Sequence, residues 1–312
     1  MGIRFRGWGI GLPDKIVTND DLSLTLDTSD AWISERTGIR ARRIGGTTRS
    51  LGADAGRAAL LDANLSPDDI DFLILATTSA DRIAPSTAAM IQADVGLSCP
   101  AMDLNAACSG FVYGLRVAQG LTEVGTRRIM LIGSENLSRW TDWTDRSTAV
   151  LFGDGAGATI LEYDAEGSDV LSFVLGTDGA SADILACEHE SYFTMDGREV
   201  FRRAVRVVVE SSERAIAEAG LQPSDIHLVI PHQANVRIIQ AVVDRLGIPM
   251  EQAVVTLDRY GNTSSSSIPL AFHAAREEGR IREGEYALLT GFGAGMTWAS
   301  SVVRWSPGPG VL

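Results

Sequence analysis

Cys108 is the residue of this sequence that is placed to act as a nucleophile. It follows a strand-like stretch that ends in small residues, and a helical pattern begins at Phe111. We therefore expect the sulfur at or just before a helix N-terminus, where unpaired N–H groups and the helix dipole favour a thiolate over a thiol. Such a thiolate could attack an acyl thioester, whereas the ordinary alternative for a lone cysteine is inert burial.

The other two cysteines are weaker candidates for a nucleophile. Cys99 lies in a loop before Pro100, and Cys187 precedes Glu188, whose charge disfavours a thiolate. The three cysteines form no CxxC pair, and no histidine cluster accompanies them at zinc-ligand spacing. We therefore expect neither a disulfide framework nor a bound metal.

Two further polar residues could recognise an oxyanion that develops next to this sulfur. His232 follows an apolar strand pattern over residues 228–231, and chemistry in α/β sheets gathers at the carboxyl ends of strands. Asn262 opens a run of small hydroxyl residues, and its amide could donate to a thioester oxygen. The alternatives are a structural histidine with satisfied hydrogen bonds and a flexible or helix-capping loop. The remaining histidines are interpreted as surface or structural residues: His189, His227 and His273.

The elements that position these residues repeat at half the length of the chain. Segments 65–75 and 221–231 each follow a helical pattern, turn through x-Pro-x-Asp and enter an apolar run, at an offset of 156 residues. The apolar runs 128–133 and 286–291 form a second pair. Apart from a chance likeness between α/β units, this pattern predicts a duplicated unit whose two sheets pack around shared helices in one body.

Composition and charge narrow the class of protein. The chain has 312 residues, of which 45% are hydrophobic and 21% charged, as in globular proteins. No apolar run approaches the roughly 20 residues of a membrane span, and the N-terminus lacks a signal-peptide pattern, so we expect a cytoplasmic protein. A formal charge of −13 argues against nucleic acid as a partner.

The motifs together resemble those of β-ketoacyl-acyl carrier protein synthase III, the initiating condensing enzyme of fatty-acid synthesis. The resemblance runs from about residue 8 to residue 304 and rests on segments 106–111, 231–235, 261–264, 27–33, 35–39, 145–148 and 152–157. It implies an α/β, thiolase-like fold, with duplicated βαβαβαββ halves in a five-layer αβαβα arrangement. The expected halves are residues 1–165, which carry the cysteine, and residues 166–312, which carry the histidine and the asparagine.

By this resemblance, Cys108 takes an acyl group from acyl-CoA. A malonyl thioester on acyl carrier protein then enters, and His232 and Asn262 hold its carbonyl while CO₂ leaves and the enolate attacks the acyl-cysteine. His232 should act as a neutral donor, and no cofactor is needed. The backbone N–H groups of Cys108 and of the turn at Ala294 should hold the tetrahedral oxyanion. Some members of the family have glycine in place of Ala294, where a positive φ would strain alanine.

The resemblance also implies how CoA is bound. Trp32 should stack on adenine, and Arg36 and Arg146 should contact the adenine and the phosphates. Three residues should line the pantetheine tunnel: Gly197, Phe201 and Asn235. The alternatives are a core aromatic at Trp32 and a surface ion pair at Arg36.

The carrier protein is acidic, so an enzyme with a net charge of −13 needs a local basic patch to meet it. The candidates, which could also be a merely solvated basic face, are Arg202, Arg203, Arg206, Arg237 and Arg245. The family is a homodimer in which a loop like 81–86 of the other subunit closes the acyl pocket. Ala84 is small where some members carry a bulky aromatic, so acyl groups longer than acetyl should fit.

Three rival functions remain at this point. A relative from secondary metabolism could make a starter unit or pass its acyl group to an acceptor other than malonate. A hydroxymethylglutaryl-CoA synthase would need a catalytic glutamate, and no glutamate lies near Cys108 in the sequence. A non-catalytic subunit would be expected to lack Cys108 or His232, and both are present.

Overall fold

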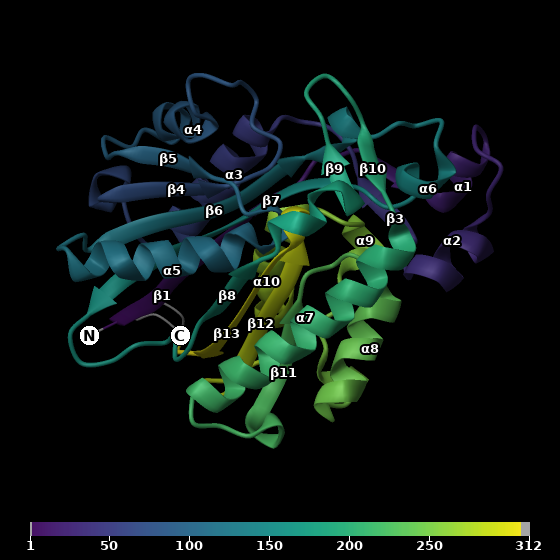
Figure 1. Ribbon diagram of the computed structural model, residues 1–312. Helices are drawn as coiled ribbons and strands as arrows, with labels where there is room; N and C mark the ends of the chain where they lie inside the picture. Colours follow the sequence, from purple (N-terminus) through teal and green to yellow (C-terminus); the bar gives the residue numbers. More distant parts are fainter. Residues whose placement is uncertain (1, 307–312) are drawn as a thin grey trace.

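The first sheet is built by the apolar runs of the first half of the chain. The structure is a computed structural model that describes residues 2–306 (Figure 1). The strands, in sheet order, are β1 (Gly2–Gly11), β7 (Asp154–Asp164), β6 (Arg128–Asn136), β4 (Phe72–Ala76) and β5 (Ala101–Leu104). β4 runs parallel to β5 and β6, whereas β7 is antiparallel to β6 and β1. β4 reads Phe-Leu-Ile-Leu-Ala without alternation because helices cover both faces of the sheet.

The second sheet repeats this strand order, except that the counterpart of β5 is only a single β-bridge. Its strands are β11 (Ile226–Pro231), β12 (Tyr286–Gly293), β13 (Thr297–Arg304) and β8 (Val174–Thr177). Directions match as well, because β11 and β12 are parallel while β13 is antiparallel to both of its neighbours. The counterpart of β5 is a single parallel bridge between Val229 and Ala253. The expected duplication is therefore confirmed as a repeat of sheet topology.

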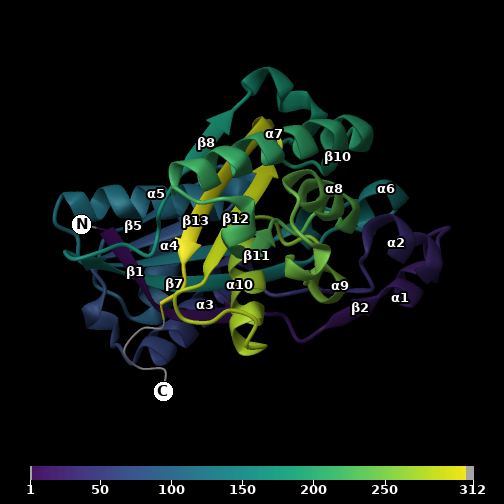
Figure 2. The ribbon, with the colours of Figure 1, turned by 90° about the horizontal axis from the view of Figure 1, so that it is seen from below.

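Helices complete five layers. α5 (Gly110–Glu123) and α10 (Ser267–Glu277) contact strands of both sheets and so form the middle layer. α3 (Thr48–Ala63) and α4 (Thr87–Val95) cover the outer face of the first sheet, and α7 (Gly197–Glu218) and α8 (Val236–Leu246) cover that of the second. Figure 2 shows α10 beneath the strands β12 and β13. The expected αβαβα arrangement is confirmed.

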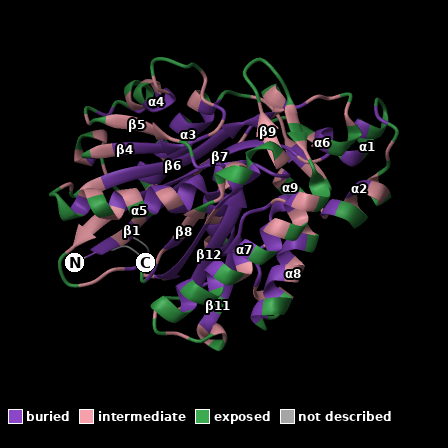
Figure 3. Ribbon diagram, viewed as in Figure 1, coloured by how far each residue is buried: buried purple, intermediate pink, exposed green. Residues whose placement is uncertain are grey.

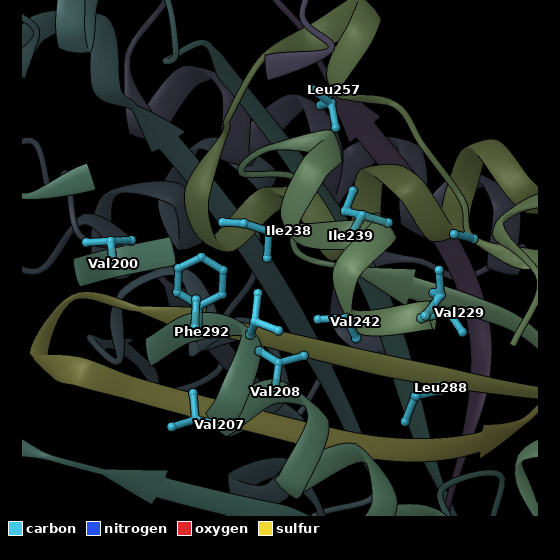
Figure 4. Packing of buried hydrophobic residues seen from close by; sticks show 14 of the residues in the cluster. Val200, Val207, Val208, Val229, Ile238, Ile239, Val242, Leu257, Leu288 and Phe292 are labelled. Carbon is cyan, nitrogen blue, oxygen red and sulfur yellow. The ribbon is translucent and has the colours of Figure 1, made fainter. Parts of the chain in front are cut away.

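The core of the second half shows how the helix pattern produces this packing. In α8 the buried positions follow the i, i+3, i+4 spacing of an amphipathic helix. They are Ile238, Ile239, Val242, Val243 and Leu246. Val207 and Val208 of α7 join them against the sheet at Leu288 and Phe292 (Figure 4). This cluster fixes α8, and with it the segment that precedes α8, against the strand β11.

The two x-Pro-x-Asp segments form the same local structure. Residues Pro67–Asp69 and Pro223–Asp225 are each a single 3₁₀ turn. The carboxylate of Asp69 accepts the N–H of Ser66, and that of Asp225 accepts the N–H of Gln222. In both cases the turn leads into the parallel strand, β4 or β11, as the repeat predicted.

Several short helices and strands belong to none of the five layers and lie together at one end of the molecule (Figure 1). They are β2 (Ile16–Thr18), α1 (Asn19–Ser23), α2 (Asp30–Thr37), β3 (Ala41–Arg43), α6 (Arg146–Ala149), β9 (Leu185–Cys187), β10 (Phe193–Met195) and α9 (Leu257–Tyr260). Figure 3 shows that the central strands of both sheets are mostly buried, while the edge strand β5 is half-buried and the β9–β10 hairpin and its loop carry exposed residues. Within residues 2–306, no helix is long and apolar enough to cross a membrane.

Candidate active site

Cys108 lies in a strained turn directly before α5. Residues Ala107–Ser109 form a 3₁₀ turn, and Ala107 has a φ of 49°, which is uncommon for a residue other than glycine. The Asn105 carboxamide oxygen accepts the N–H of Ala107 at 3.1 Å, and the Ser109 hydroxyl donates to the Ala106 carbonyl at 2.9 Å. The turn presents Cys108 to a cavity of about 490 Å³. The expected position at a helix start is therefore found.

The resting state of Cys108 differs from the expectation of a thiolate. Burial raises the pKa of the Cys108 thiol to about 12, and the charge of Glu135 adds to the rise. The Ser264 hydroxyl and the Cys108 N–H act in the opposite direction. The thiol form therefore prevails at neutral pH, and negative charge on the sulfur has to be stabilised as the attack proceeds.

His232 follows β11 and faces the same cavity. The side chain is 4% exposed, its Nδ1 lies 2.7 Å from the Ser267 hydroxyl, and its ring meets that of Phe292 edge-on at 5.5 Å. The Ser267 oxygen also accepts the Gln233 N–H at 3.3 Å. Among the described residues the Ser267 proton has no acceptor other than Nδ1, so Nε2 carries the imidazole proton. Burial lowers the pKa of His232 to about 3, in agreement with a neutral donor.

Asn262 reaches the cavity from a turn that leads into α10. Its carboxamide oxygen accepts the N–H of Ser264 at 2.9 Å, so the NH₂ end of the amide is the end left to donate. Ser264 has a φ of 49°, and residues Ser264–Ser266 form a 3₁₀ turn before the helix. The hydroxyl run is therefore a buried, hydrogen-bonded turn and not the flexible loop that its composition allowed.

The glycine-rich turn after β12 approaches the nucleophile closely. A Cβ added to Gly293 would lie 2.5 Å from the Cys108 nitrogen and 2.7 Å from the Ala107 Cβ, so only glycine fits there. The positive φ of this turn falls on Gly295, at 117°, and not on Ala294. The backbone strain expected at Ala294 is therefore absent. Ala294 lines the same cavity as Cys108.

A buried glutamate that the sequence did not reveal lies behind the nucleophile. Glu135, in β6, is 0% exposed and accepts from the three residues Thr77, Thr78 and Ser79 and from Ser265. No glutamate lies near Cys108 in the sequence, but the fold brings Glu135 close enough for its charge to raise the pKa of the Cys108 thiol. Because donors already surround the carboxylate, it is a structural anchor and not a free acid or base.

The residues assigned to the CoA nucleotide come together at the cavity mouth. The guanidinium carbons of Arg36 and Arg146 lie 4.6 and 4.8 Å from the centre of the Trp32 ring. Trp32 and Arg36 line the cavity, and Arg146 is held by the Asp27 carbonyl at 2.7 Å. The half-buried indole is therefore already covered by cations, which an adenine would have to join or displace.

The residues assigned to the pantetheine tunnel line the same cavity. Gly197 begins α7, and Phe201 follows one turn later, with the Arg237 guanidinium 6.0 Å from its ring. The Asn235 side chain caps α8 by accepting the Arg237 N–H, and it donates to the Arg36 carbonyl at 3.0 Å. Asn235 thus fastens the second half of the chain to α2 at the mouth.

The arginines assigned to the carrier protein occupy α7 and α8, but not equivalently. Arg202 pairs with Glu199 at 2.8 Å, and Arg203 pairs with Glu199 and Asp178. Within residues 2–306, Arg206, Arg237 and Arg245 are exposed and in no ion pair. Arg237 lines the cavity, whereas Arg245 lies at the far end of α8, about 12 Å along its axis.

A second cavity, of about 910 Å³, lies on the other side of the Cys108 turn. Asp81, Arg82 and Ile83 line it together with Asn105 and the β9–β10 hairpin. Ala107 and Ala294 border both cavities. The turn that carries Cys108 therefore borders two cavities, one lined by Cys108 and Trp32 and the other by residues of the 81–86 loop.

Comparison with known proteins adds to this geometry. Two family models match the chain: one of 3-oxoacyl-[acyl-carrier-protein] synthase III over residues 102–179, and one of its C-terminal part over residues 216–305. The β-ketoacyl-[acyl-carrier-protein] synthase III of Roseiflexus sp. (strain RS-1) is 48% identical, covering 96% of this chain and 97% of its own length.

Solved structures are similar over nearly the whole chain. The 3-oxoacyl-[acyl-carrier-protein] synthase III from Aquifex aeolicus VF5 superposes with a TM-score of 0.95 at 42% identity, covering 97% of this chain and 100% of its own. The priming β-ketosynthase from the R1128 polyketide biosynthetic pathway superposes with a TM-score of 0.93 at 35% identity, covering 99% of this chain and 97% of its own.

Proposed function

The chain belongs to the β-ketoacyl-[acyl-carrier-protein] synthase III family, and on that premise we propose that Cys108, His232 and Asn262 perform its reaction. The fold is thiolase-like. The enzyme is an acyltransferase that condenses an acyl-CoA with malonyl-acyl carrier protein and so initiates fatty-acid synthesis. The observation that carries the assignment of residues is their convergence, from two halves of the chain, on one cavity of about 490 Å³.

In the first half-reaction the Cys108 sulfur attacks the acyl-CoA carbonyl. The new bond joins sulfur to the acyl carbon, the bond to the CoA sulfur breaks, and the thiol proton leaves with CoA. The Cys108 and Ala294 N–H groups hold the tetrahedral oxyanion. The close approach of Gly293 to the Cys108 nitrogen supports this, because it brings the two backbones together at the sulfur.

In the second half-reaction the malonyl thioester carbonyl accepts from His232 Nε2–H and from the Asn262 NH₂. Two neutral donors stabilise the enolate as CO₂ leaves, and its carbon then attacks the acyl-cysteine to give 3-oxoacyl-acyl carrier protein. The depressed pKa of His232 and its bond to Ser267 support a neutral donor, and the Ser264 N–H fixes the amide of Asn262.

CoA enters past Trp32, with Arg36 and Arg146 meeting the adenine and phosphates and Gly197, Phe201 and Asn235 along the pantetheine. The cluster of cation and indole at the mouth supports this path. The acidic carrier protein docks on the exposed arginines around the same mouth, of which Arg237 is nearest to the cavity. Arg206 and Arg202 contribute beside it, and Arg245 lies at the edge of the patch.

The acyl chain occupies the second cavity, which a second copy of the chain completes. β5 is an edge strand that pairs only with β4, and its residues are half-buried. Ile83, on the nearby 81–86 loop, is 93% exposed. An open edge and an exposed apolar side chain support an isologous homodimer through this face. With Ala84 at the loop, the pocket accepts acyl groups longer than acetyl.

Two further assignments complete the proposal. The chain divides near residue 165 into its two thiolase-like halves, since β7 ends at Asp164 and β8 begins at Val174. The enzyme works in the cytoplasm, where its CoA and carrier-protein substrates are made.

Intact-protein mass spectrometry tests the proposed function. The protein is incubated with acyl-CoA esters of increasing length and branching, and malonyl-acyl carrier protein is then added. We expect an acyl adduct on Cys108 that disappears as 3-oxoacyl-carrier protein forms. An adduct on another residue would overturn the site. Transfer of the adduct to an oxygen or nitrogen acceptor but not to malonate would favour a secondary-metabolism acyltransferase. The other secondary-metabolism alternative, a starter-unit synthase, is favoured by the likeness to the R1128 protein, which is a priming β-ketosynthase.

A further inference from the structure

The Ser264 hydroxyl is a buried polar group without a hydrogen-bond partner. The residue is 3% exposed, and within residues 2–306 its Oγ makes no hydrogen bond of normal geometry, although it lies close enough to the Cys108 sulfur to lower the pKa of that thiol. The hydroxyls that follow it are all engaged: Ser265 with Glu135, Ser266 with the Thr263 carbonyl, and Ser267 with His232. A buried hydroxyl without a hydrogen-bond partner lowers the stability of the folded protein, so its presence calls for a functional explanation.

The backbone holds Ser264 in place at a further cost. Its φ of 49° is left-handed, which disfavours any residue with a Cβ, and glycine would relieve it. Strain of this kind gathers at functional sites. The only other non-glycine left-handed residue lining this cavity, among residues 2–306, is Ala107, next to Cys108. Two strained turns, one of which carries Cys108, therefore line the same cavity.

We propose that Ser264 is a further catalytic residue, whose hydroxyl donates a hydrogen bond to the Cys108 sulfur while that sulfur is anionic during acyl transfer. The proposal rests on the proposed function, because it requires Cys108 to be the nucleophile. As the Cys108 sulfur attacks the acyl carbon, the bond from that carbon to the CoA sulfur breaks and the thiol proton passes to the departing CoA sulfur. During this step the Ser264 O–H donates to the negative charge that develops on the Cys108 sulfur. Once the sulfur–carbon bond has formed, the charge and the hydrogen bond disappear together.

The electrostatics of the sulfur agree with this role. Burial raises the pKa of the Cys108 thiol, and the Ser264 hydroxyl is the strongest influence that lowers it. The hydroxyl and the backbone N–H of Ser264 have separate roles, because the N–H, and not the hydroxyl, donates to the Asn262 carboxamide oxygen. Removal of the hydroxyl alone should therefore weaken the first half-reaction and leave decarboxylation of malonyl-carrier protein intact.

Three variants of the full-length protein test the proposal. Ser264→Ala removes the hydroxyl, Ser264→Gly removes it while relieving the backbone, and Ser301→Ala removes a buried hydroxyl of β13 that donates to the Ser172 carbonyl outside the cavity lining. For each, three quantities are measured: the single-turnover rate of Cys108 acylation by acyl-CoA, the pH dependence of Cys108 alkylation by iodoacetamide, and the rate of malonyl-carrier protein decarboxylation.

We expect both Ser264 variants to acylate at least about tenfold more slowly, as for the loss of a hydrogen bond to a charged group. Their alkylation profiles should move up by about one pH unit, and decarboxylation should stay within about twofold of the unsubstituted enzyme. Ser301→Ala should match the unsubstituted enzyme in all three. A melting curve identifies a variant that has not folded, and Ser264→Gly then carries the test because its backbone is the less strained.

Several outcomes would overturn the inference. They are an unchanged acylation rate and alkylation profile in Ser264→Ala, a recovery of both in Ser264→Gly, or an equal loss of decarboxylation, which would mean that the whole turn had moved. Acylation of the unsubstituted enzyme at a residue other than Cys108 would instead overturn the proposed function itself. The two failures are therefore distinguishable.

Discussion

The turn before α5 and the turn before α10 are the same structure in two copies, at a constant displacement of 157 residues. Asn105 accepts the N–H of Ala107 as Asn262 accepts that of Ser264. Ala107 and Ser264 share a φ of 49°. The Ser109 hydroxyl donates to the Ala106 carbonyl at 2.9 Å, and the Ser266 hydroxyl donates to the Thr263 carbonyl at the same distance.

The two turns differ in which residue they turn toward the cavity. The first presents Cys108, while Asn105 lines the second cavity and is exposed. The second turn presents Asn262. Ser265, the counterpart of Cys108, does not line the cavity, and its hydroxyl donates a hydrogen bond to Glu135. In the proposed mechanism, one backbone arrangement thus supplies the nucleophile in one half and a hydrogen-bond donor in the other. On that proposal the duplication provides both of these catalytic components.

The largest effect should come from removing the donors of the second half. Asn262→Ala and His232→Ala should each slow malonyl decarboxylation by about 100- to 1,000-fold, because each deletes one hydrogen bond to the developing enolate. Acylation of Cys108 should partly survive. Carbon dioxide release and single-turnover acylation measure the two steps. Asn105→Ala is the matched control in the equivalent turn and should lose less than about tenfold in either. Retained condensation in a His232 or Asn262 variant would contradict the assignment.

A substitution of Gly293, which packs against the turn that carries Cys108, should have the next largest effect. In Gly293→Ala the new Cβ would collide with the Cys108 nitrogen and the Ala107 Cβ. Displacement of the nucleophile by about 1 Å should slow acylation about 100-fold, as measured by CoA release. The control is Gly120→Ala, at an exposed site of α5 where nothing lies within 4 Å of the added Cβ. Normal acylation in Gly293→Ala would show that the close approach has no catalytic meaning.

The half-reactions should also respond differently to pH. Because the Cys108 thiol has a pKa of about 12, its thiolate fraction rises tenfold for each unit of increasing pH below that value. Acylation and alkylation should therefore accelerate steadily from pH 6 to about pH 9. His232, with a pKa of about 3, stays neutral over this range, so decarboxylation should be flat. A plateau of alkylation near pH 7 would mean that the thiolate is already formed in the resting enzyme.

The smallest effect should fall on docking. Arg237→Glu reverses a charge at the cavity mouth and should raise the KM for malonyl-acyl carrier protein several-fold, with acyl-CoA loading nearly unchanged. Arg214→Glu makes the same change of net charge on α7, about 25 Å along the helix from Gly197, and should change neither. An equal effect of Arg237→Glu on both half-reactions would argue against a docking patch.

The sequence predicted the features that depend on local pattern. The apolar runs of β4 and β11, the Pro-Asp turns before them and the helix start after Cys108 follow from periodicity and turn chemistry. The five layers followed from the repeat and the resemblance together. The equivalence of the two turns was missed because it lies in the backbone. Asn-Ala-Ala-Cys-Ser and Asn-Thr-Ser-Ser-Ser share few side chains, but their third residues share a φ of 49° and their other dihedral angles are similar.

What the sequence could not predict depends on long-range packing. Glu135 is one polar residue in the strand β6, and only the fold brings it to the donors Thr77–Ser79 and Ser265. The thiol state of Cys108 has the same origin, because a helix start in isolation favours the thiolate and burial outweighs it. The bond from Ser267 to His232, which sets the tautomer, likewise joins residues 35 positions apart.

The placement of α5 and α10 in the middle layer bears on how the enzyme loses activity on heating. Both helices begin directly after the catalytic turns and are covered by a sheet on either side. Freeing either turn therefore requires the sheets to separate, an opening that costs nearly the full free energy of unfolding. The segments around the mouth, such as the β9–β10 hairpin, have no such cover. If CoA binds at this mouth as proposed, warming should weaken CoA binding before it slows the chemical steps, and irreversible inactivation should coincide with global unfolding.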